Sequence, residues 1–473
     1  MPTLVASTPL AHDRNAVFAW HERAGAFTRL TPPGFGRVES ESPSLRPGAT
    51  ATMRINLPGP KLPIGRPVST RWVARHVEYD PPRSFTDEMT SGPLRSWRHE
   101  HDFAEVDGRT LLIDRVSYEL PRWARVAGSS IEQRLGQFFA YRGRALSADL
   151  DFHARYSGER RTVLIAGASG LVGSQLAALL SGGGHRVRRL VRGRTDPHRD
   201  EVFWDPEAGR FDSAVLDEVD VVINLAGHPI AGRFTPAHLD RVRRSRVAST
   251  ALLAGALAER AADGRARALI NASASGYYGS DRGDELLSED AAPGTGPLAE
   301  IVRAWEEATR PAAEAGVRVA CVRTGIVQSP AGGQLGLQLP LFTAALGGPL
   351  GDGRQFMPWL AIDDIAYTYA FLALTDNEGP FNAAAPGIVD GNTYARTLAE
   401  VVGRPAWVRV PKFAPALLLG KDGADDFALA GQRMVPERLT AAGFRFGYPN
   451  LADALRHVLA TGEDGPTTVS CTG

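Results

Sequence analysis

The sequence predicts an α/β fold, a Rossmann-type doubly wound parallel sheet, preceded by an α+β unit in which a curved sheet grips one long helix. Three observations support this prediction. A short apolar run, Val163–Ala166, leads directly into a glycine-rich turn and a helix start. Beyond it, strand-length apolar segments alternate with helical stretches. Before it, apolar and charged side chains alternate with a period of two, which indicates half-buried antiparallel strands.

The first unit, residues 1–155, contains strand-like segments followed by a helix. One strand, 97–103, places four large side chains on one face: Trp97, His99, His101 and Phe103. Ser129 and Ser130 are positioned to cap a helix whose apolar face reaches Leu150. A sheet that grips a helix in this way usually encloses an apolar cavity, so we expect this unit to bind a hydrophobic small molecule.

Residues 156–161 are polar and predict a linker to a second unit, 162–463. Its strand candidates are Val163–Ala166, Arg186–Val191, Val219–Leu225, Ala268–Ala272, Val317–Arg323 and Gly379–Asn382. Strands separated by helices indicate a parallel sheet with helices on both faces. Residues 464–473 are polar and are expected to form a disordered tail.

The bulk composition excludes several classes of function. Lysine plus arginine equal aspartate plus glutamate at 53 each, so nothing favours a nucleic-acid partner. No apolar run is long enough to cross a bilayer, and the start of the chain does not resemble a signal peptide. The two cysteines, Cys321 and Cys471, form no metal or redox motif, so a cytoplasmic location is expected. The oligomeric state is not indicated.

The glycine-rich turn after Ala166 predicts a dinucleotide site. Gly167 permits a tight turn, Gly170 lets a phosphate approach the backbone, and Gly173 lets the helix pack on its strand. The pyrophosphate is expected at the helix N-terminus, where backbone N–H groups are free. Small residues end another strand and offer a second surface for the cofactor. The predicted cofactor-binding residues are Gly167, Ser169, Gly170, Leu171, Val172, Gly173, Val191, Arg192, Leu225, Ala226 and Gly227.

The end of the next strand favours NADP over NAD. An NAD site places an acidic residue there, to bind the ribose hydroxyls, and this chain has none. Arg192 follows the strand instead and is suited to pair with a 2′-phosphate. The competing interpretation is that Arg192 is a solvated surface residue.

Together these features resemble the extended short-chain dehydrogenase/reductase superfamily, and residues 162–460 look like its atypical NAD(P)-dependent epimerase/dehydratase branch. The resemblance rests on motifs spread along the chain, namely Asn224-Leu-Ala-Gly227, Ser245-Arg246-Val247, Ser273–Gly279, Ala304-Trp305-Glu306, Gly347–Gln355, Trp359–Asp364 and Phe381–Pro386. Residues 1–155 resemble, more loosely, the helix-grip (START/Bet v 1-like) superfamily of ligand-binding proteins.

The superfamily resemblance implies a Tyr-x-x-x-Lys proton relay, which this chain lacks. By spacing, Leu298 stands in place of the tyrosine and Val302 in place of the lysine. No catalytic residue is therefore identified. Ser275 and Tyr277, just after the strand Ala268–Ala272, are weak candidates, although Tyr277 with Tyr278 could equally pack as aromatic core.

Other candidate residues carry competing interpretations. Arg354 occupies a position that in this superfamily often meets a substrate phosphate, but it could equally pair with Asp352 or Asp364. Asp363 and Asp364 are expected to cap the following helix. The pair His99 and His101, with His76, could bind a metal, but no carboxylate or cysteine clusters nearby in the sequence, so no metal is expected.

Two functions stay open on this sequence. The first is an NADP-dependent oxidoreductase or epimerase that acts on a small carbonyl or hydroxyl compound, with the first unit capturing a hydrophobic substrate. The second is a non-catalytic protein that binds or senses NADP(H), since the proton relay is missing. The first unit could also bind a protein partner.

Overall fold

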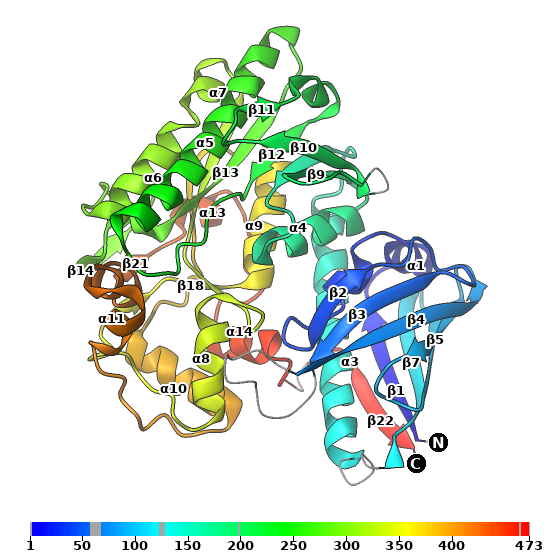
Figure 1. The fold of residues 1–473 in the computed structure, drawn as a ribbon. Coiled ribbons are helices and arrows are strands. Elements are labelled where there is room, and N and C mark those ends of the chain that lie inside the picture. The colour runs from blue at the N-terminus through cyan, green and yellow to red at the C-terminus, as the bar shows by residue number, and fades with distance from the viewer. Residues whose placement is uncertain (1, 57–67, 123–127, 197–198, 463–464, 473) are drawn as a thin grey trace.

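Two large sheets dominate the computed structural model: one contains strands from both ends of the chain, and the other is formed by its middle (Figure 1). The structure describes residues 2–472 apart from 57–67, 123–127, 197–198 and 463–464. Within that part of the chain, no helix combines the length and the apolar character needed to cross a membrane.

The first sheet is antiparallel, with strand order β2-β3-β4-β5-β6-β7-β1-β22. Its strands are β1 (Thr3–Leu10), β2 (Gly36–Ser40), β3 (Thr50–Asn56), β4 (Ser69–Asp80), β5 (Ser84–Ser91), β6 (Ser96–Val106), β7 (Arg109–Glu119) and β22 (Thr468–Thr472). Two short helices, α1 (Arg14–His21) and α2 (Ala26–Arg29), follow β1. The long helix α3 (Gly128–Arg155) lies against the sheet and buries Leu135, Phe139 and Leu146. The expected order of strands followed by one helix is confirmed.

The expected disordered tail is wrong. Thr468–Thr472 form β22, which pairs antiparallel with β1 from Thr3↔Thr472 to Ser7↔Thr468. The polar sequence of this segment did not predict a strand. A strand at the edge of a sheet is held by backbone hydrogen bonds to one neighbour and needs only one buried face, so its sequence can be polar.

The second sheet has the order β11-β10-β9-β8-β12-β13-β15-β19, and all its pairs are parallel except β10 with β11. Its strands are β8 (Thr162–Ala166), β9 (Arg186–Val191), β10 (Glu201–Asp205), β11 (Arg210–Phe211), β12 (Val221–Asn224), β13 (Ala268–Ala274), β15 (Arg318–Thr324) and β19 (Gly379–Ala383). The six strands expected from the sequence all form. The chain reverses its direction of winding between β8 and β12, which is where a doubly wound sheet opens a ligand crevice.

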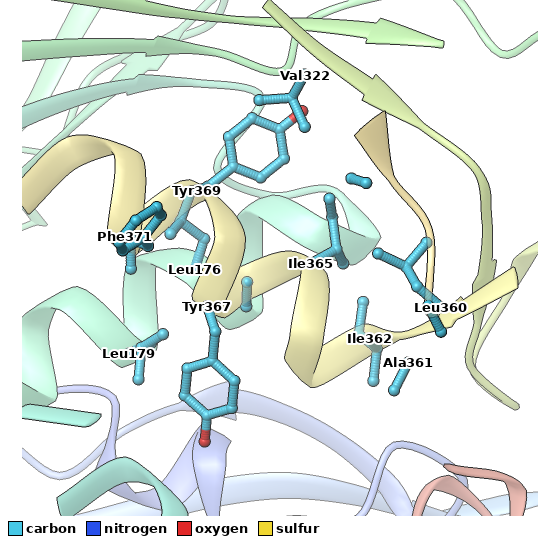
Figure 2. Close-up of a cluster of buried hydrophobic side chains, with 14 of the residues drawn as sticks. Leu176, Leu179, Val322, Leu360, Ala361, Ile362, Ile365, Tyr367, Tyr369 and Phe371 are labelled. Carbon is cyan, nitrogen blue, oxygen red and sulfur yellow. The ribbon is translucent and has the colours of Figure 1, made fainter. Parts of the chain in front are cut away.

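Helices cover both faces of this sheet. They are α4 (Leu171–Gly182), α5 (Pro236–Arg260), α6 (Pro297–Glu307), α7 (Arg310–Glu314) and α9 (Ile362–Leu374), whereas α14 (Leu451–Val458) packs against α10 (Gly391–Val402). Helix α9 is buried along nearly its whole length, because α4 packs on one side of it and the sheet on the other. Figure 2 shows Leu176 and Leu179 of α4 and Val322 of β15 around it.

The remaining elements lie in the C-terminal half. They are β14 (Asp281–Leu287), β16 (Ile326–Gln328), α8 (Gly333–Thr343), β17 (Phe356–Met357), β18 (Trp359–Ala361), β20 (Val389–Asp390), α10 (Gly391–Val402), α11 (Ala414–Leu419), α12 (Lys421–Gly423), β21 (Gly431–Met434) and α13 (Glu437–Ala441).

A buried ion-pair network joins the two halves of the molecule. The Arg29 guanidinium, from α2, donates to both oxygens of Asp149 on α3, at 2.9 and 2.8 Å. It also lies 2.7 Å from Asp363 on α9. Tyr367, which points away from the sheet in Figure 2, donates to Asp149 at 2.6 Å. His457 of α14 contacts the other oxygen of Asp363 at 3.0 Å.

Asp363 and Asp364 were expected to cap α9, and that expectation is wrong. Helix α9 begins after Ala361 and has no side-chain cap. Asp363 serves the network around Arg29, and Asp364 accepts hydrogen bonds from the backbone N–H groups of Gly447 and Tyr448, at 2.6 and 3.1 Å. Both carboxylates lie in the first helical turn, where the helix dipole favours negative charge, but their partners come from distant segments.

Candidate functional site

The glycine-rich turn lies at the carboxyl end of β8, beside the crevice between β8 and β12. Gly167 has a φ of +81°, which an L-residue with a side chain rarely adopts, and a Cβ there would lie 2.8 Å from the carbonyl oxygen of Leu225. A Cβ on Gly173 would lie 2.2 Å from the carbonyl oxygen of Gly167. The close packing of turn, strand and helix expected from the sequence is therefore confirmed at both positions.

The N-terminus of α4 offers free hydrogen-bond donors. Gly170 is the N-cap and carries no side chain that could cap the helix, and no acidic residue lies in the first turn. The N–H of Ser174 donates to the Gly170 carbonyl at 3.0 Å. The described residues supply no acceptor to the N–H groups of Leu171, Val172 and Gly173. Unpaired amides at a helix N-terminus fit a diphosphate, and this arrangement is the fit expected of a dinucleotide.

The second surface of the crevice follows β12. Asn224 is fully buried, and its amide nitrogen donates to Thr250 and Asn271 at 2.9 Å each. Its oxygen accepts from the N–H of Ala226 at 3.2 Å, so Asn224 fixes the loop rather than facing a ligand. Leu225 and Ala226 are half-buried and Gly227 is exposed. This loop thus presents small residues beside the turn.

Two arginines lie near this loop. Arg192 is exposed directly after β9 and makes no ion pair within the described part of the chain. The pKa of His228 is lowered, first by desolvation and then by nearby positive charges that include Arg241, Arg246 and Arg192. Arg192 therefore stands close enough to the 225–228 loop to act on a charge there.

Arg246 is a residue to which the sequence analysis gave no role. Its guanidinium donates to the carbonyl of His228 at 2.8 Å and lies 5.0 Å from the ring centroid of Trp305. A Cβ on Gly227 would lie 3.2 Å from its Cζ atom, and burial lowers the pKa of Arg246 to about 10. Its place in the sequence could have indicated this role. Arg246 lies on α5, the first helix after the loop that follows β12, and it contacts that loop.

The end of β13 carries the weak catalytic candidates. Ser275 and Tyr277 belong to a short 3-10 turn, Ser275–Tyr278, and both are half-buried. The Arg323 guanidinium lies 3.4 Å from the ring centroid of Tyr277. Ser273, which precedes the turn, donates to Glu306 at 2.6 Å.

Arg323 and Tyr278 form a closed polar network. Arg323 donates to both oxygens of Glu306, at 2.9 and 3.0 Å, and to the Tyr278 hydroxyl at 3.1 Å. Tyr278 donates in turn to Asn382 at 2.7 Å, and burial raises its pKa. Tyr278 is therefore part of the core, as one of the two interpretations held, whereas Tyr277 keeps exposed surface.

Apolar side chains fill the place of the missing proton relay. Leu298 and Val302 lie on α6, are buried, and face the turn: a Cβ on Gly276 would lie 3.6 Å from Leu298 and 3.7 Å from Val302. Neither side chain can donate or accept a proton. The site thus has the geometry of a cofactor crevice without a tyrosine–lysine pair.

Arg354 is exposed and keeps its guanidinium out of every ion pair among the described residues. Its backbone N–H donates to Asp352 at 3.2 Å, and the Asp352 carboxylate pairs with Lys412 at 3.0 Å. Asp364 is engaged elsewhere, so neither expected pairing of the Arg354 side chain forms.

Comparison with known proteins places this site in a family. The model of the NAD dependent epimerase/dehydratase family matches residues 163–384, and a domain of unknown function, DUF1731, matches residues 410–458. "Epimerase family protein Mb2239" of Mycobacterium bovis is 41% identical over 295 residues, which are 62% of this chain and 96% of that protein. Human "Epimerase family protein SDR39U1" is 32% identical over 303 residues, which are 63% of this chain and 99% of that protein.

Two solved structures extend the comparison. The nucleoside-diphosphate sugar epimerase from Corynebacterium glutamicum has 36% identity and a TM-score of 0.79, over 97% of this chain and 90% of that chain. Human epimerase family protein SDR39U1 (isoform2), solved with NADPH, has 29% identity and a TM-score of 0.56, over 63% of this chain and 98% of that chain. With its crevice, its glycine turn and these relatives, the chain belongs to the NAD-dependent epimerase/dehydratase family.

Proposed function

We propose that the protein binds NADP(H) in the crevice between β8 and β12 and uses it as an oxidoreductase or epimerase on a small carbonyl or hydroxyl compound. The observation that carries the proposal is the helix N-terminus at Leu171–Gly173, whose N–H groups find no acceptor in the described part of the chain and lie beside two glycines that admit no side chain. The human relative solved with NADPH supports the choice of cofactor. Arg192 is exposed, forms no ion pair with the described residues, and is suited to bind the 2′-phosphate.

The residues of this chain would divide the work as follows. The backbone amides after Gly170 would bind the diphosphate. Gly227 has no side chain, so the cofactor could approach the backbone of the loop that packs on Arg246. The bound cofactor supplies hydride transfer. Tyr277 is half-buried in the turn that follows β13, with the Arg323 guanidinium 3.4 Å from its ring centroid, and its hydroxyl would be the proton donor. Ser275 begins the same turn, two residues earlier, and is also half-buried.

A second function has a specific observation in its favour. Leu298 and Val302 occupy the relay position as buried apolar residues, and Arg323 is already neutralised by Glu306. A protein that binds NADP(H) as a structural or sensed ligand needs no proton relay. The two functions therefore differ in one observable property: an enzyme would oxidise bound NADPH with a carbonyl substrate, and a sensing protein would not.

We also propose that residues 1–155 form a helix-grip unit that holds a ligand for the nucleotide-binding unit, residues 162–463. The antiparallel sheet and helix α3 support this proposal, but the space beneath α3 does not admit a water molecule, so a ligand could enter only if side chains moved. Its lining is mixed rather than apolar: Thr8, His21, Leu30, Leu112, Asp114, Arg142, Gly143 and Leu146. A ligand there would need a polar group as well as apolar surface. The two free cysteines are consistent with a cytoplasmic location.

The test is calorimetric titration of the full chain with NADPH and with NADH, followed by a turnover assay on a panel of carbonyl compounds. Tight NADPH binding with NADPH oxidation supports the enzyme. Tight binding with no turnover across the panel, and identical results for Tyr277→Phe, supports the sensing function. Absence of binding to either nucleotide refutes both.

A further inference from the structure

A second cluster of chemically active side chains lies far from the crevice, buried in the first sheet. His99 and His101 of β6 face Asp87 on β5 and Asp114 on β7. Asp87 is directly opposite His99, and Asp114 is directly opposite His101. The histidines are 5% and 3% exposed. No metal was expected from the sequence. The adjacent carboxylates, Glu100 and Asp102, alternate with the histidines and so belong to the other face of the strand, but the strand register brings two carboxylates from β5 and β7 to the histidines.

Three of these groups have the spacing of metal ligands. The Asp87 Oδ2 atom lies 3.3 Å from His101 Nε2 and 3.6 Å from His99 Nδ1. All three ligand atoms lie within 4.8 Å of one another. Zinc binds such atoms at about 2.0–2.1 Å, so two ligand atoms of a tetrahedral site are about 3.3 Å apart. The 3.3 Å contact between Asp87 and His101 therefore equals the length of an edge of that tetrahedron. The 3.6 Å contact between Asp87 and His99 is about 0.3 Å longer than an edge.

The fourth residue, Asp114, contacts the two histidines on the side away from Asp87, where it could orient their rings. Its Oδ1 atom lies 2.9 Å from His99 Nε2 and 2.8 Å from His101 Nδ1, the ring nitrogens that face away from Asp87. Metal-binding histidines almost always donate their other ring N–H to a carboxylate or a carbonyl, which fixes the tautomer. Asp114 already pairs with His99 in this way, and its 2.8 Å contact with His101 Nδ1 has the length but not the angles of a hydrogen bond, so a small rotation of that ring would let one carboxylate serve both histidines.

One contact in the cluster leaves room for a cation. His99 Nε2 pairs with Asp114 at 2.9 Å, and its other ring nitrogen, Nδ1, lies 3.6 Å from the Asp87 carboxylate, which is too far for a hydrogen bond. When Nε2 donates to Asp114, Nδ1 carries a lone pair, so it and the Asp87 carboxylate are two acceptors that a cation between them would satisfy.

The surroundings of the cluster supply a fourth possible metal ligand, His76, and one partly exposed side chain, Asp87. His76 on β4 is directly opposite Asp87, is 8% exposed, and its Nδ1 atom has no hydrogen-bond partner among the described residues. The Asp87 side chain is 14% exposed, so an ion can reach the cluster from that side. Arg142, from α3, is buried, and the charges of Asp114 and Asp87 partly offset the lowering of its pKa by burial.

We propose that Asp87, His99 and His101 bind a divalent transition-metal ion, with zinc as the ion that suits these ligands best, and that Asp114 orients both histidines. Three protein ligands leave a fourth coordination position for water or for a ligand of the first unit. The competing account needs no metal: burial would lower the pKa of His101, but Asp114 and Asp87 together raise it, and a charged His101 would then bridge the two carboxylates.

The test uses the full-length chain without an affinity tag, stripped of metal with a chelator and titrated with Zn²⁺ by calorimetry. We expect uptake of about one ion per chain. His99→Ala and Asp87→Asn should each weaken binding at least about 100-fold, and Asp114→Asn about 10- to 100-fold. His12→Gln is the matched control, because His12 also contacts an aspartate, Asp151, at 2.8 Å but lies outside the cluster, and its affinity should not change.

A second measurement keeps the proposal testable if a variant fails to fold. Wild-type protein loaded with Co²⁺ should show the intense visible absorption of a tetrahedral site, and one equivalent of Zn²⁺ should abolish it. No stoichiometric uptake of either ion by the wild-type chain would overturn the proposal in favour of the charged His101. Uptake that His99→Ala and Asp87→Asn leave unchanged would overturn it as well, because the ion would then be bound elsewhere.

Discussion

Replacing Gly173 by alanine should weaken NADPH binding without unfolding the protein. The added Cβ would lie 2.2 Å from the Gly167 carbonyl oxygen and 2.9 Å from the Cα atom of Ala168. An ordinary contact needs about 3.4 Å or more, so the helix must move away from the turn by roughly 1 Å. Overpacking of this kind costs about 1–3 kcal/mol of folding free energy.

The same displacement moves the amides of Leu171 and Val172 away from a diphosphate bound at the turn. Loss of one hydrogen bond to a charged group is worth about 1.5–3 kcal/mol, which corresponds to roughly a 10- to 100-fold weaker Kd for NADPH. Calorimetry measures this directly, and NADH should lose the same factor, because the diphosphate is common to both nucleotides.

Gly255→Ala is the matched control. Gly255 also lies in a helix, α5, and a Cβ there meets nothing within 4 Å. That variant should bind NADPH normally and gain about 0.5–1 kcal/mol of stability, since alanine loses less freedom in a helix than glycine does. If Gly173→Ala also binds NADPH with an unchanged Kd, the turn does not hold the diphosphate and the assignment of the crevice fails.

Three further predictions concern charges. Arg192→Ala should weaken NADPH binding by about 1–3 kcal/mol and leave NADH nearly unchanged, and an equal loss for both nucleotides in calorimetry would exclude a phosphate role. Arg29→Met should lower the free energy of unfolding by about 3–5 kcal/mol in urea titrations, because it removes the guanidinium shared by the buried carboxylates of Asp149 and Asp363. Arg310→Met, whose side chain is 65% exposed in the wild type, should cost about 0–1 kcal/mol, and a similar loss in both variants would contradict the network. Burial raises the pKa of Asp364 to about 7, so the folded state binds more protons than the unfolded state between about pH 4 and pH 7, and stability should fall as pH rises through that window. Chemical denaturation at several pH values checks this, and Asp364→Asn, which has no proton to lose, should remove that part of the slope.

The parallel sheet was predictable because its signals are local. Each buried strand is a short apolar run, and the turn after Ala166 combines three glycines whose spacing has a steric reason. The absence of a proton relay could also be predicted from the sequence. Leu298 and Val302 lie on α6 and face the turn after β13, where the tyrosine and the lysine were expected.

Contacts between distant segments were not predictable. Asp87 and Asp114 meet His99 and His101 through strand register, which depends on turn geometry and on the pattern of both neighbours. Arg29 reaches Asp363 across more than 300 residues, and no feature of its own helix indicates this. The expected capping role of Asp363 and Asp364 failed for the same reason, because tertiary partners took their carboxylates.

The pairing of β22 with β1 has a consequence for the order of folding. The strand β1 is made about 460 residues before its partner β22, so during synthesis β1 exposes an open backbone edge that neighbouring chains could extend. Closing so long a loop adds little to the equilibrium cost, since the entropy grows only with the logarithm of length, but it delays completion of the sheet. A nascent chain of this protein is therefore most vulnerable to edge-to-edge aggregation until residues 468–472 leave the ribosome, and a variant without those residues should keep that edge open.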